Sequence, residues 1–275
     1  MSQLKLDLHD IQGNIVKAYG RYGFPKGRYV FFSVCERLAG RQFVAALVPL
    51  ITTSAPWRER GTQSSSPVPE VTTNVAFSYH GLRELGVPRA SLQTFPDEFA
   101  MGMKARRDIL GDDGASAPEC WDPIWQSADP VDIFVAIHGQ DEPCLERRYQ
   151  QIAALVQHSK GGVKLLTGHR GEDGRADLPY QAATAIYIDG EPSPKEHFGF
   201  TDGISDPFFK GTGAHESNVV GGGKVTHLPP GTRLGWEALE TGEFLLGYKD
   251  EALELPEAPS PKLLSHNGTF MVYRK

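Results

Sequence analysis

The sequence has few cysteines and no pattern that pairs them. Three occur among 275 residues, at Cys35, Cys120 and Cys144, and none belongs to a CxxC or similar spacing. A sparse, odd set of cysteines is typical of reduced thiols in a cytoplasm, whereas disulfide frameworks use even, dense sets. We therefore predict a cytoplasmic protein without a structural disulfide.

Long apolar runs and an excess of positive charge are also missing. Residues 1–20 alternate polar and apolar types, which argues against a secretory signal peptide. No run approaches the roughly 18 apolar residues that would indicate a membrane span. The formal net charge of −6 argues against general binding to nucleic acid or anionic membranes, because both favour a positive surface. We expect no nucleic acid and no membrane as partners.

Several common catalytic motifs are absent. Segment 219–225 has the glycines and lysine of a phosphate loop, but Asn218 and Val225 stand where that motif needs a glycine and a Ser or Thr. The sequence contains no GxSxG elbow and no HExxH motif. Its histidines form no tight cluster with cysteines or carboxylates, which gives a zinc site little support. We interpret the following as surface or hydrogen-bonded core histidines: His80, His138, His158, His169, His215, His227 and His266.

The sequence does contain a regular succession of strand and helix patterns. Strands are predicted over residues 28–34, 131–139, 161–171 and 182–190. Segment 71–87 is predicted to begin as a strand and to change to a short helix at Gly81. Longer helices are predicted over 39–51 and 142–159. A helical insertion follows the second strand. The order strand, helix, strand, strand, helix, strand is that of the ferredoxin-like split βαβ unit. We therefore predict an α+β fold with an antiparallel sheet.

The chain becomes irregular after Gly190, where glycine, proline and aromatic residues replace periodic patterns. A long irregular segment in a compact protein is usually functional. Within it, the stretch KEHFGFTDGISDPFFKG places Asp202 between glycines and aromatic residues. This aspartate could form an Asx-turn with Gly203 supplying a positive φ. Alternatively, it could be an acid–base carboxylate beside a flat apolar ligand, since Gly199 and Gly203 would allow a close backbone approach. Composition alone leaves both interpretations open.

Residues 199–203, GFTDG, match the GxxDG motif of the dye-decolourising peroxidases, a family of haem enzymes built from two ferredoxin-like domains. Five further segments resemble family segments in family order: 10–16, 74–87, 95–112, 243–248 and 267–275. The resemblance covers nearly the whole chain. It implies half of a two-domain, dimeric α+β barrel-like peroxidase fold.

The resemblance also implies a haem-dependent peroxidase that reduces hydrogen peroxide and oxidises dyes, phenols or another small aromatic reductant one electron at a time. By resemblance, Asp202 is the distal acid–base catalyst, which takes a proton from the peroxide and returns it to the leaving oxygen. The cofactor is haem b. Residues implied to lie against it are Gly199, Phe200, Thr201, Gly203, Ile204 and Ser205.

In the family, the proximal histidine and the distal arginine follow the strand that corresponds to residues 267–275. His227, His266 and Arg274 come too early to match those positions. We therefore assign no metal ligand to this chain. We expect a second polypeptide with the C-terminal ferredoxin-like domain to supply the iron ligand and the arginine.

These inferences give a predicted domain organisation. Residues 1–25 form an N-terminal arm, 26–190 the ferredoxin-like domain, 191–265 an irregular haem-facing segment, and 266–275 the first strand of the otherwise missing second domain. Two alternatives remain open. One is a truncated binding module without catalysis, and the other is a haem carrier that uses one of its own histidines. Trp236, Tyr248 and Tyr273 are interpreted as packing residues rather than as an electron relay.

Overall fold

The computed structural model describes residues 4–17, 19, 23–58, 66–193, 195–196, 198–201, 208–212, 223–226 and 235–274. The chain divides into two compact units. The sheet unit consists of Phe24–Ile51, Glu70–Thr184 and Phe270–Lys275, and the loop unit of Met1–Gly23, Thr52–Pro69 and Ala185–Thr269. In the described part of the chain, no helix combines the length and the apolar character that crossing a membrane requires.

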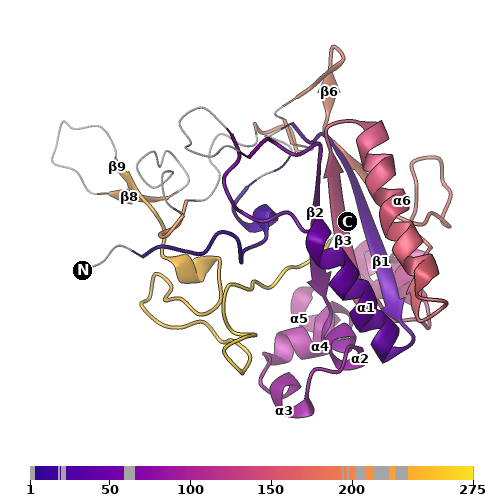
Figure 1. Ribbon diagram of the computed structural model, residues 1–275, viewed down its shortest axis with the longest axis horizontal. Coiled ribbons are helices and arrows are strands. Elements are labelled where there is room, and N and C mark those ends of the chain that lie inside the picture. Colours follow the sequence, from indigo (N-terminus) through magenta and orange to yellow (C-terminus); the bar gives the residue numbers. More distant parts are fainter. Residues whose placement is uncertain are drawn as a thin grey trace. The chain divides into compact units, whose positions relative to one another are not determined.

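An antiparallel sheet forms the centre of the sheet unit (Figure 1). Its strands are β1 (Lys26–Val34), β2 (Val71–Phe77), β3 (Ile133–Gly139) and β4 (Val163–Leu165), in the order β2-β3-β1-β4. The short β5 (Gln181–Thr184) pairs with the first half of β1. Every pairing is antiparallel. This topology confirms the predicted α+β, ferredoxin-like fold.

Two helices cover one face of the sheet, α1 (Arg37–Leu47) and α6 (Glu142–His158) (Figure 1). Successive side chains of a strand point to opposite faces, so Val30 and Phe32 of β1 turn toward these helices and pack with Phe43 of α1 and Ile152 of α6. The continuous apolar runs in β1 and β3 follow from this arrangement, because the alternate residues are also covered on the other face.

The opposite face of the sheet carries a cluster of aromatic residues. Phe31 of β1 lies 5.1 Å from Phe134 of β3, 5.2 Å from Trp125 and 5.3 Å from Tyr273, measured between ring centroids. Burial raises the pKa of Tyr273 to about 12. The ring of Tyr273 therefore packs against the sheet as part of a small second core.

Side-chain caps explain where the two long helices begin. The Glu36 carboxylate accepts hydrogen bonds from the backbone N–H groups of Leu38 and Ala39, at 2.9 and 2.6 Å. At the start of α6, the Asp141 carboxylate accepts one from the Cys144 N–H at 2.8 Å, and a proline occupies the first turn. Both caps satisfy N–H groups that have no partner within the helix.

The predicted helical insertion lies between β2 and β3. It consists of α2 (Tyr79–Glu84), α3 (Arg89–Leu92), α4 (Asp97–Ala105) and α5 (Arg107–Leu110), followed by the 3-10 turns Gly114–Ser116, Pro118–Cys120 and Pro123–Gln126. Gly81 allows α2 to approach the sheet, because a Cβ there would lie 2.1 Å from the Asp132 carbonyl oxygen.

The described residues of the loop unit form little regular structure. Its strands are the pairs β6 (Tyr187–Ile188) with β7 (Glu191–Pro192) and β8 (Lys224–Thr226) with β9 (Gly235–Glu237). Phe209 is fully buried and stacks on Phe244, with ring centroids 4.7 Å apart. The predicted strand over 182–190 is in fact two short strands, β5 and β6, which belong to different units.

Residues 269–274 belong to no helix or strand and form no strand pairing with the described residues. Phe270 packs on Phe99 at 5.2 Å between ring centroids, and the Arg274 guanidinium forms an ion pair with Asp112. The sequence predicts that this segment is the first strand of a second sheet, and that remains a prediction.

Candidate functional site

The GxxDG motif lies only partly within the described residues. Gly199, Phe200 and Thr201 are described, whereas Asp202, Gly203, Ile204 and Ser205 lie outside the described residues. The site is therefore described from the loop that leads into Asp202, of which residues 195–196 and 198–201 are described.

That loop is closed at both ends by hydrogen bonds. Lys195 and Thr201 form an antiparallel bridge, and the Lys195 ammonium donates to the Thr201 hydroxyl at 2.9 Å. The Glu196 carboxylate accepts hydrogen bonds from the backbone N–H groups of Phe198 and Phe200, both at 2.7 Å. These contacts pair the backbone on both sides of Gly199 with Glu196, directly before Asp202.

Gly199 forms the bend of this loop. Its φ is +92°, in the region that favours glycine, and its N–H donates to the Glu196 carbonyl oxygen at 3.0 Å. A Cβ at Gly199 would meet no heavy atom within 4 Å. The backbone conformation, and not crowding inside the chain, accounts for the glycine. The open space beside it leaves room for a ligand to approach the backbone.

The two aromatic residues of the loop point away from the rest of the chain. Phe198 is 89% exposed and Phe200 is 74% exposed. Of the phenylalanines near Asp202 in the sequence, only Phe209 is fully buried, so the rings of this loop do not by themselves enclose an apolar site. A planar apolar group such as haem would cover both rings, so the exposed loop fits such a cofactor. The exposed surface of the two rings is not covered by any described residue.

Four of the histidines read as structural have defined surroundings. The His80 Nδ1 lies 2.6 Å from Asp132, the His158 Nδ1 2.6 Å from the Ala154 carbonyl oxygen, and the His266 Nε2 3.1 Å from the Tyr248 hydroxyl. Loss of hydration lowers the pKa of His138 to about 4. His215 and His227 lie outside the described residues. Among the residues with described positions, no group of three His, Cys, Asp or Glu side chains could hold a metal ion.

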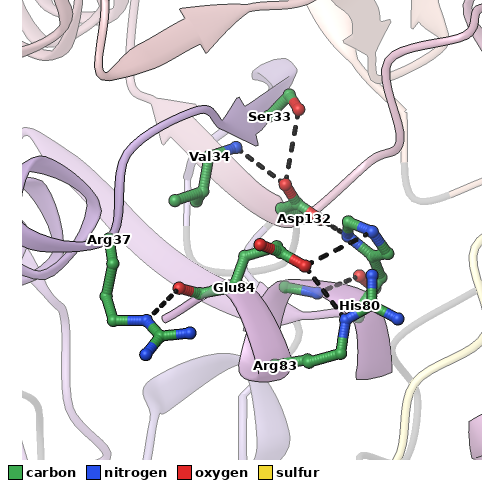
Figure 2. Close-up of polar contacts among 9 residues, drawn as sticks. Ser33, Val34, Arg37, His80, Arg83, Glu84 and Asp132 are labelled. Carbon is green, nitrogen blue, oxygen red and sulfur yellow. Dashed lines mark hydrogen bonds and ion pairs between the residues drawn. The ribbon is translucent and has the colours of Figure 1, made fainter. Parts of the chain in front are cut away.

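A polar network that the sequence analysis did not find surrounds Asp132 (Figure 2). Asp132 is fully buried at the start of β3, and its Oδ2 accepts a hydrogen bond from the Val34 N–H at 2.7 Å. Its Oδ1 contacts His80 of α2, whose Nε2 lies 3.7 Å from the Glu84 carboxylate. The buried carboxylate thus joins β1, β3 and α2, with both oxygens engaged. This arrangement indicates a structural role in fixing the insertion to the sheet.

The sequence contains a weak signal for this network. Asp132 follows Val131 and precedes a strand of apolar residues, where a charged residue needs a partner if it is buried. The identity of that partner depends on the fold, because His80 is 52 residues away in the chain.

Comparisons with known proteins agree with this fold. A family model described as the DyP dimeric alpha+beta barrel domain matches residues 10–170. The Dye-decolorizing peroxidase of Mycena epipterygia is 27% identical over 271 residues, which are 98% of this chain and 41% of that protein. Peroxidase 2 of Mycetinis scorodonius is 28% identical over 214 residues, covering 75% of this chain and 34% of that protein.

A solved structure gives the same result. The structure of an ancestral D-type dye decolorizing peroxidase superposes with a TM-score of 0.62 at 25% identity, covering 92% of this chain and 47% of that one. The chain therefore spans less than half the length of these relatives.

Proposed function

The chain belongs to the dye-decolourising peroxidase family, and from this premise we propose that it forms the Asp202-bearing part of a haem-dependent peroxidase. The proposed reaction is reduction of hydrogen peroxide coupled to one-electron oxidation of dyes, phenols or another small aromatic reductant. The observation that carries the proposal is the GFTDG motif, at the end of a closed loop, in a chain whose residues 10–170 match the family model. Haem, when bound, supplies the redox chemistry.

The proposed role of Asp202 is general acid–base catalysis. Its carboxylate takes the proton from hydrogen peroxide and returns it to the oxygen that leaves as water. Such a relay works only if the carboxylate is held at a fixed place. The Glu196 hydrogen bonds to Phe198 and Phe200 support this role, because they fix the backbone two residues before Asp202.

We propose that the same loop binds haem b through Gly199, Phe200, Thr201, Gly203, Ile204 and Ser205. The exposed Phe200 ring and the open space at Gly199 support this assignment. The exposed Phe198 ring would add apolar contact with the flat cofactor. Covering these rings would also exclude water from the loop. The iron ligand is not assigned to this chain.

We propose that the complete haem site also includes a C-terminal ferredoxin-like domain, outside residues 1–275, with the proximal histidine and the distal arginine. The relatives support this proposal, because each is more than twice as long as the part that this chain matches. The apolar side chains of Phe270, Met271 and Val272 also support it, since they are 40%, 46% and 70% exposed. A segment that has no strand partner and carries exposed apolar side chains is suited to pairing with another strand. The proposed domain bounds are those predicted from the sequence, and so is the cytoplasmic location.

The substitution Asp202→Asn in the assembled enzyme tests the proposed role. Asparagine keeps the shape of the side chain but cannot relay the proton, so the reaction with hydrogen peroxide should slow by roughly 10²- to 10⁴-fold while haem stays bound. Stopped-flow absorption measures this rate, and the visible spectrum before mixing measures bound haem.

The matched control is Asp189→Asn, at the turn between β6 and β7, where φ is +52° and asparagine is well tolerated. This variant should react like the unaltered enzyme. An Asp202→Asn enzyme with an unchanged rate would remove Asp202 from the mechanism.

A further inference from the structure

A cleft in the sheet unit is lined by three arginines. It has a volume of about 620 Å³ and lies between the first residue of α1 and the turn that joins α2 to α3. Arg37, Arg83 and Arg89 line it, and none of the described residues along it is acidic. The chain as a whole has a net charge of −6, so this is a local concentration of positive charge on an acidic protein.

The three arginines keep most of their hydrogen-bonding capacity. The Arg37 Nε donates to the Glu84 carbonyl oxygen at 3.2 Å, and the Arg83 Nε donates to the Glu84 carboxylate at 2.9 Å (Figure 2). Within the described part of the chain, no group accepts a hydrogen bond from their terminal nitrogens. The Arg89 guanidinium has neither an ion pair nor a hydrogen bond with the described residues. Seven donor nitrogens therefore remain for a ligand, two from each engaged arginine and all three of Arg89.

The nearby carboxylates are already engaged. Glu36 accepts two backbone hydrogen bonds at the start of α1, and these lower the pKa of its carboxyl. Glu84 contacts both Arg83 and His80. Two carboxylates thus stand near three arginines, and the cleft keeps an excess of positive charge.

The cleft is built on a fixed turn. The Arg41 guanidinium donates to the carbonyl oxygens of Leu85 and Gly86, at 2.6 and 3.3 Å, and the Val87 N–H donates to the Leu82 carbonyl oxygen at 2.9 Å. Gly86 has a φ of +86°, which the turn requires. A ligand would therefore meet a preformed surface.

One side of the cleft is apolar. Val87, Pro88 and Leu92 line it together with the arginines. We propose that the cleft binds an organic anion in which a phosphate or carboxylate group is attached to an apolar group. The planar guanidinium groups match the geometry of either anionic group and can bind it through paired hydrogen bonds. The apolar residues would contact the remainder of the ligand. This proposal is independent of haem and of the peroxidase reaction.

Titration of the full chain with phenyl phosphate tests the proposal. The Nε–H signals of the arginines in ¹H–¹⁵N NMR spectra report binding directly. Phenyl phosphate should shift the signals of Arg37 and Arg83 in a saturable way, and inorganic phosphate and phenol, which each carry one half of the probe, should both bind more weakly. Added salt should weaken binding, because the attraction is between charges near the surface.

Arg89→Gln is the most informative variant, because its side chain is not needed for any described contact and its loss should leave the fold intact. It should weaken phenyl phosphate binding by about fivefold or more, the effect expected for losing one charge-assisted contact at an exposed site. The matched control is Arg147→Gln on α6, whose side chain is 64% exposed and pairs with Glu70. The control should bind phenyl phosphate like the unaltered chain.

Two results would overturn the proposal. One is the absence of saturable shifts up to about 10 mM phenyl phosphate, a concentration at which a millimolar Kd would still be seen. The other is equal binding by Arg89→Gln and Arg147→Gln, which would place the anion outside the cleft. Equal affinity for inorganic phosphate and phenyl phosphate would overturn the apolar half of the proposal.

Discussion

His138 lies on β3 with its ring against β1. The Tyr29 ring is edge-on to it, with centroids 5.7 Å apart, and a Cβ at Gly27 would lie 3.2 Å from the His138 Cδ2. Loss of hydration in this position lowers the pKa of the imidazole from 6.5 to about 4. The native fold therefore holds this histidine neutral where the unfolded chain would protonate it.

This difference predicts a pH dependence of stability. Between about pH 6.5 and pH 4 the unfolded chain binds one more proton than the folded chain at this site, so the contribution of His138 is complete above pH 6.5 and is lost as the pH falls toward 4. The ring keeps some exposure, so the loss is at most about 3 kcal/mol. His138→Gln should reduce the difference in unfolding free energy between pH 7 and pH 5, as measured by urea titration. His158→Gln, at an exposed position on α6, should leave it unchanged; an unchanged difference in His138→Gln would refute this assignment.

A second prediction concerns the buried carboxylate of Asp132. In Asp132→Asn, one carboxylate oxygen becomes an amide donor, so either the Val34 N–H or His80 loses its acceptor. The free energy of unfolding should fall by about 2–3 kcal/mol, the cost of leaving a buried polar group unpaired. Asp129→Asn, which alters an ion pair with Lys164 at an exposed position, should cost less than about 1 kcal/mol. Comparable losses in the two variants would show that the network does not stabilise the fold.

At the scale of elements, α2 depends on Gly81. A Cβ at this position would lie 2.1 Å from the Asp132 carbonyl oxygen and 2.7 Å from its carbonyl carbon. Both are backbone atoms of the residue directly before β3, so the helix must move away from the sheet. We expect Gly81→Ala to lower the unfolding free energy by about 3 kcal/mol or more.

Thermal unfolding measures this effect, with Gly268→Ala as the control. A Cβ at Gly268 would have its nearest neighbour at 3.8 Å, so the control should unfold close to the temperature of the unaltered chain. If Gly81→Ala unfolds at that temperature too, the close packing of α2 on β3 is wrong.

Sequence patterns predict some strands correctly and miss the division of another. The runs at 28–34 and 131–139 predict β1 and β3 correctly because both faces of these strands are buried, which gives continuous apolar sequences. The run at 182–190 is also rich in apolar residues, but it forms two strands. Local composition does not record that β5 pairs with β1 while β6 pairs with β7. Pairing partners are a property of the folded chain.

The functional features also differ in whether the sequence alone reveals them. The GxxDG motif is contiguous, so a resemblance finds it. The arginine cleft and the Asp132 network combine residues from α1, α2, α3 and β3, and no spacing in the sequence links Arg37 to Arg89 or His80 to Asp132. The exposure of Phe198 and Phe200 was also not predicted, because aromatic composition indicates an apolar surface without saying whether this chain covers it.

At the scale of the whole molecule, the proposed haem site depends on the domain that would complete it. The family model and the ferredoxin-like sheet establish the fold, and the relatives are more than twice as long as the matched region. We propose that a C-terminal ferredoxin-like domain, outside residues 1–275, completes the haem site. The two alternatives, a haem carrier that uses its own histidine and a module without catalysis, predict different compositions for the haem-containing sample.

The most direct test is a visible absorption spectrum of the sample obtained by purifying this chain. A denaturing intact-mass spectrum of the same sample is recorded beside it. The account predicts a Soret band only from a sample that also contains the C-terminal ferredoxin-like domain, and none from residues 1–275 alone after hemin is added. A Soret band from this chain alone would contradict the account, because one of its own histidines would then bind the iron.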